Sequence, residues 1–123
     1  MEIRLGYYLI WSGNYRALAD WYIEKLGLTV AEELDHPDDT GIDLKIGDRN
    51  LWIGQHSEVK GKNQDPHRHM INFNVKSVSQ AYAELKAKDV EFIAAPFKAP
   101  TFDKYFATFL DLDGNVLQLV GDK

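Results

Sequence analysis

The chain has 123 residues, of which 45% are apolar, and this predicts one domain with enough apolar side chains for a core. The net charge of −5 argues against a nucleic-acid backbone as the partner. There is no apolar run long enough to span a membrane and no signal-peptide pattern at the N-terminus, so we expect a cytoplasmic protein. The absence of cysteine removes disulfides, thiolate nucleophiles and thiolate metal ligands together.

The first half of the chain has the pattern of one strand, one helix and three further strands. Asn14 can cap the first turn of the helix and Gly27 can end it, while Leu18 and Tyr22 lie on one apolar side. The acidic segment 35–41 predicts a loop. The expected elements are a strand over 3–11, a helix over 15–26, and strands over 28–34, 42–46 and 51–55.

The second half repeats this plan after a polar linker. Ser77 and Gln80 form a capping-box pattern at the start of the second helix, and Asp89 suits a left-handed position after its end. Pro96 indicates a loop. Asp113-Gly114-Asn115 is a strong signal for a tight turn. The expected elements are a strand over 70–75, a helix over 78–88, a strand over 91–94 and a closing hairpin over 105–120.

The two halves correspond to each other by spacing. Tyr7 corresponds to Met70, and Asn14 corresponds to Ser77. We therefore expect an α+β fold in which two βαβββ modules form a cleft. Within the single domain 1–123, module one covers about 1–55, the linker about 56–68 and module two about 69–121.

Two segments resemble the vicinal oxygen chelate superfamily, which includes glyoxalases, bleomycin-resistance proteins and extradiol dioxygenases. One is the turn at 111–115, which reads Asp-Leu-Asp-Gly-Asn, and the other is the helix end at 21–28, which reads Trp-Tyr-Ile-Glu-Lys-Leu-Gly-Leu. The resemblance covers essentially the whole chain and implies a homodimer.

The resemblance also implies positions for a metal site, with ligands on the first and last strands of each half. These positions hold Tyr7, Met70, Gln118 and either Trp52 or Gly54. None is a histidine or a carboxylate residue, the side chains that divalent ions prefer as ligands. We therefore expect no metal cofactor at the usual site.

Three histidines allow a different metal site. His56, His67 and His69 lie at the two ends of the linker, and three imidazoles can hold zinc. We favour solvated loop histidines, because no close spacing makes the three converge. His69 is also a candidate for a catalytic acid or base, since imidazole titrates near neutral pH, although we favour a solvated or capped strand end there.

Aromatic and amide side chains give the preferred prediction of function. They suit a planar or amphipathic organic ligand, so we predict a protein that binds a small molecule without the usual metal. The acidic segment 35–39 can attract a cationic ligand, although we favour a solvated loop there. The alternatives are a lyase, isomerase or dioxygenase with a histidine-based metal site, and a dimerising or regulatory domain with a vestigial cleft. The expected ligand-binding residues are Tyr7, Trp52, Met70, Asn72, Tyr105 and Gln118.

Overall fold

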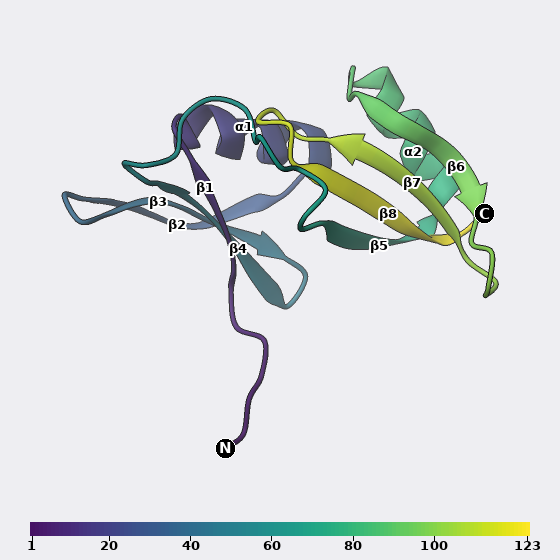
Figure 1. The fold of residues 1–123 in the computed structure, drawn as a ribbon, viewed down its shortest axis with the longest axis horizontal. Helices are drawn as coiled ribbons and strands as arrows, with labels where there is room; N and C mark the ends of the chain where they lie inside the picture. The colour runs from purple at the N-terminus through teal and green to yellow at the C-terminus, as the bar shows by residue number, and fades with distance from the viewer. The chain divides into compact units, whose positions relative to one another are not determined.

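Each half of the chain forms its own four-stranded sheet with one helix, in a computed structural model that describes residues 1–123 (Figure 1). The first unit, Met1–Gly61, contains β1 (Tyr8–Ser12), α1 (Tyr15–Leu26), β2 (Thr29–His36), β3 (Asp39–Ile46) and β4 (Arg49–Gln55). The second unit, Lys62–Lys123, contains β5 (Ile71–Ser77), α2 (Val78–Ala87), β6 (Phe92–Lys98), β7 (Tyr105–Leu110) and β8 (Val116–Asp122). Neither helix has the length and apolar character needed to cross a membrane.

The two sheets have the same topology. The strand orders are β1-β4-β3-β2 and β5-β8-β7-β6, and in each sheet the first strand pairs in parallel with the last. The remaining pairs are antiparallel. The predicted α+β fold with two βαβββ modules is therefore confirmed.

In the first unit, α1 covers one face of the sheet and leaves the other face open. The Asn14 side chain accepts a hydrogen bond from the Ala17 backbone N–H at 3.3 Å, and Gly27 ends the helix with a φ of 70°. The helix packs on β1, β3 and β4. The largest fully buried apolar side chains of this core are Leu18, Tyr22, Ile42, Leu44, Leu51 and Ile53.

In the second unit, α2 covers one face of the sheet. Ser77 Oγ accepts from the Gln80 backbone N–H at 3.2 Å, which confirms the predicted cap, and Asp89 takes the predicted left-handed conformation with a φ of 61°. The core on this face includes Val78, Leu85, Ala107, Phe109, Leu117 and Leu119. The face that carries Gln118 lies on the other side of the sheet, because side chains alternate along a strand.

The closing hairpin turns where the sequence predicts it. The buried carboxylate of Asp111 accepts from the backbone N–H groups of Asp113 and Asn115, both at 2.9 Å, and from Asn115 Nδ2 at 2.8 Å. Gly114 has a φ of 78°, a conformation that glycine adopts without steric cost.

The predicted first strand is too long at its N-terminal end. β1 begins at Tyr8 rather than at Ile3, and residues 1–7 are exposed (purple in Figure 1). Tyr8 pairs with Leu51 in β4, so in the same register residues 3–5 would lie beyond the start of β4 at Arg49 and have no strand to pair with. Apolar composition predicts a strand here, but a strand also needs a neighbour to hydrogen-bond.

Two predicted loops are also wrong. Most of the acidic segment 35–41 lies in strands, because β2 and β3 continue to the pair His36 and Asp39 and only Pro37 and Asp38 form the turn. Pro96 lies inside β6 rather than in a loop. β6 is an edge strand with a register shift between Ala94 and Phe97, a place where a residue without a backbone N–H is tolerated.

Candidate ligand site on the first sheet

Two rows of paired residues cross the open face of the first sheet. In one row, Leu9 pairs with Trp52, Trp52 with Asp43, and Asp43 with Glu32. Residues that are paired on neighbouring strands project from the same face. This row therefore brings together side chains that are far apart in the sequence, from all four strands.

The second row has two glycines at its centre, which leave space above the sheet. Trp11 pairs with Gly54, Gly54 with Gly41, and Gly41 with Leu34. A Cβ atom added to either glycine would collide with the indole of Trp52, and one on Gly54 would also lie 2.6 Å from Trp11 Cζ3. The two glycines thus let the indole lie over the sheet, where Trp52 is only 7% exposed.

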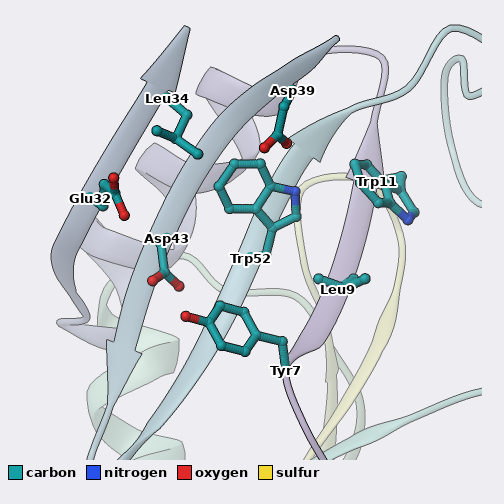
Figure 2. A pocket seen from close by; sticks show the side chains of 8 residues that line it. All are labelled: Tyr7, Leu9, Trp11, Glu32, Leu34, Asp39, Asp43 and Trp52. Atoms are coloured by element: carbon teal, nitrogen blue, oxygen red, sulfur yellow. The ribbon is translucent and has the colours of Figure 1, made fainter. Parts of the chain in front are cut away.

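A pocket of about 350 Å³ lies over these rows (Figure 2). Its volume falls within the usual range for small-molecule sites. Three aromatic rings, two leucines and three carboxylates line it, with no lysine, arginine or histidine. The lining residues are Tyr7, Leu9, Trp11, Glu32, Leu34, Asp39, Asp43 and Trp52.

Asp43 is the only one of the three carboxylates that is buried. It is 7% exposed, whereas Glu32 and Asp39 are exposed. Its Oδ2 accepts a hydrogen bond from Asn50 Nδ2 at 2.9 Å, but its buried Oδ1 has no partner. Figure 2 shows this carboxylate at the same end of the pocket as the hydroxyl group of Tyr7.

The structure brings two of the predicted ligand-binding residues into this pocket, Tyr7 and Trp52. Two others, Asn72 and Gln118, are paired across β5 and β8 in the second sheet, where Gln118 Nε2 lies 3.4 Å from Thr108 Oγ1. Met70 immediately precedes β5 and is 40% exposed.

Tyr105 lies elsewhere on the second sheet. It begins β7 and pairs with Gly121. By alternation it shares the face of Ala107 and Phe109, which belong to the core on the α2 side, and not the face of Thr108.

The three histidines lie outside the pocket. His56 follows β4, where its ring packs edge-on against Trp11 with centroids 5.5 Å apart and its Nδ1 accepts from the Glu58 backbone N–H. His67 and His69 are exposed in the turn before β5. The structure contains no group of three histidine, aspartate or glutamate side chains that could hold a metal ion.

The donor set at the usual metal positions does not fit a divalent ion. Tyr7 and Trp52 would offer a phenol and an indole N–H, which is a donor only, and Met70 and Gln118 would offer a thioether and an amide. Hard or borderline divalent ions need carboxylates or imidazoles. The residues at these positions therefore do not form a ligand set for such an ion.

Sequence reasoning missed Asp43 as a site residue. The only available signal was the alternation Ile42-Asp43-Leu44, which places Asp43 on the face opposite the core. Such a pattern is equally typical of a solvated strand face. The cross-strand register with Trp52 is what makes Asp43 part of a pocket.

Comparison with known proteins agrees with this architecture. A sequence model of the Glyoxalase/Bleomycin resistance protein/Dioxygenase superfamily matches residues 4–119. A glyoxalase family protein from Enterococcus faecalis is 26% identical, with a TM-score of 0.80 over 95% of this chain and 96% of that chain. The curated protein sequences contain no match.

Two further solved structures, both under 25% identical, share the fold. A glyoxalase/bleomycin resistance protein/dioxygenase from Nocardioides is 17% identical, with a TM-score of 0.75 over 98% of this chain and 84% of that chain. A glyoxalase I variant from Zea mays is 18% identical, with a TM-score of 0.81 over 95% of this chain and 44% of that chain. Since the sequence model spans nearly all of both modules, the chain belongs to the glyoxalase/bleomycin resistance protein/dioxygenase superfamily.

Proposed function

We propose that this protein binds a small organic ligand in the pocket on its first sheet, without a metal at the usual positions of the family. The observation that carries the proposal is the arrangement of Trp52 over Gly41 and Gly54. Two glycines in adjacent strand interiors weaken a sheet, because glycine has no side chain to pack and loses more backbone entropy on folding. Their presence is explained if the indole has to form the floor of a binding site.

The lining supports a ligand with a flat apolar part. Trp52 provides one aromatic surface, and Tyr7 and Trp11 provide two more that are partly exposed. Such rings bind planar groups by offset stacking or edge-to-face contact and by burial of apolar area. The role that fits this lining is the binding or carrying of a ligand, since the metal that would polarise a substrate oxygen has no suitable donors here.

The experiment is a screen of aromatic fragments by ligand-observed NMR, on wild-type protein and on Trp52→Ala. We expect fragments that bind the wild type and lose their signal in the variant. Because Trp52 is buried, Trp11→Ala serves as a second pocket variant with less risk to the fold, and Trp21→Phe, on α1, is the control. The absence of any binder, or binders that neither pocket variant weakens, would overturn the proposal.

A further inference from the structure

We infer that the pocket selects organic cations, and that an N–H group of the ligand's ammonium, amidinium or guanidinium donates to Asp43 Oδ1. The inference rests on the proposed function and names the ligand class of the same site. It starts from the single buried polar side-chain atom without a hydrogen-bond partner, which is this oxygen.

A buried carboxylate oxygen without a partner is costly, because it has lost its water and gained nothing in return. Asn50 holds the other oxygen of Asp43, so the side chain cannot turn away without losing that bond. Lys45, two residues along β3 and on the same face by alternation, is exposed and belongs to none of the four ion pairs. No side chain of the protein, the nearby Tyr7 hydroxyl included, donates a hydrogen bond to Oδ1, so a bound ligand can supply that donor.

The rest of the lining favours a positive charge on that donor. Glu32 and Asp39 add two carboxylates at the rim, and no cationic side chain lines the pocket to neutralise them. The faces of Trp52 and Tyr7 are negative parts of their ring quadrupoles and attract a cation held over them. A neutral N–H donor would satisfy the hydrogen bond of Asp43 but would leave its charge uncompensated.

The probes are three molecules of nearly the same shape and different charge: benzamidine, benzamide and benzoate. Each is titrated into the wild-type protein at low salt and followed by NMR chemical shifts. We expect benzamidine to bind at least about 30-fold more tightly than benzamide, the ratio that corresponds to losing one partner of a buried charged hydrogen bond. Benzoate should bind most weakly of the three.

Two variants test whether the preference for benzamidine depends on Asp43. Asp43→Asn keeps the shape and an oxygen for Asn50 but presents an N–H group where Oδ1 was, so the preference for benzamidine should disappear. Asp39→Asn removes a charge of the same sign from an exposed position, and its effect should be a few-fold at most because exposed charges are screened. Circular dichroism checks that each variant is folded.

The outcomes separate this inference from the proposed function. If benzamidine binds the wild type no better than benzamide, including the case in which neither binds, the inference is overturned whatever the variants do. If the preference survives Asp43→Asn, the assignment to Asp43 is overturned. The proposed function, small-molecule binding in this pocket, is tested by the fragment screen. It stands if neutral fragments bind the wild type and bind Trp52→Ala more weakly.

Discussion

The close approach of Trp52 to the sheet makes Gly54→Ala an informative change. The new Cβ would lie 2.6 Å from Trp11 Cζ3 and 2.9 Å from Trp11 Cε3, and nearer still to Trp52 Nε1. Ordinary carbon–carbon contacts are about 3.5–4.0 Å, so the rings must move by about 1 Å. Trp11 is 38% exposed and can move outward, but Trp52 is held against the sheet.

We expect Gly54→Ala to lower the free energy of unfolding by about 1–3 kcal/mol, the usual cost of forcing a side chain into a packed site. It should also weaken any ligand that stacks on Trp52, because the indole tilts into the pocket. Backbone strain adds nothing, since Gly54 is not among the glycines with positive φ.

Urea unfolding followed by far-UV circular dichroism measures the stability change, and near-UV circular dichroism reports the movement of the tryptophans. Gly6→Ala is the matched control, because a Cβ on Gly6 has no atom within 4 Å. Its stability should stay within about 0.5 kcal/mol of the wild type. If Gly54→Ala were equally neutral and its near-UV spectrum unchanged, the indole would not lie where the two glycines admit it.

Three further predictions concern the rest of the chain. Asp43→Asn should raise the free energy of unfolding of the ligand-free protein by about 1 kcal/mol in urea, because an amide N–H without a partner is less costly to bury than a charged oxygen without a partner, and a clear loss of stability would contradict the account of Asp43. Asp111→Ala should cost about 2–3 kcal/mol, since three donors lose one acceptor carboxylate, while Leu112→Ala in the same turn should change stability by less than about 0.5 kcal/mol. Treatment with a chelator should leave the melting temperature unchanged, and elemental mass spectrometry of untagged protein should find no stoichiometric metal. One bound ion per chain would contradict this prediction and support the histidine-based metal site.

Local signals in the sequence were enough for the boundaries of the helices. Asn14, Gly27, Ser77 and Asp89 each act through the backbone of residues at most a few positions away, so their role can be inferred without knowing the tertiary structure. The incorrect predictions concern the ends of strands. Whether residues 3–5 can join a strand depends on where β4 begins, and whether Pro96 is tolerated depends on β6 being an edge strand.

Consecutive residues were enough to infer the βαβββ plan of both halves and the residue types at the usual metal positions, because periodicity, helix caps and motif spacing are local properties of the chain. The folded structure was needed to see that Asp43 is a pocket residue with an unpaired oxygen and that Trp52 lies over two glycines. These properties arise from register between β3 and its neighbours, which aligns residues many positions apart. A one-residue shift would turn the same side chains to the opposite face, so no reading of single strands can supply the site.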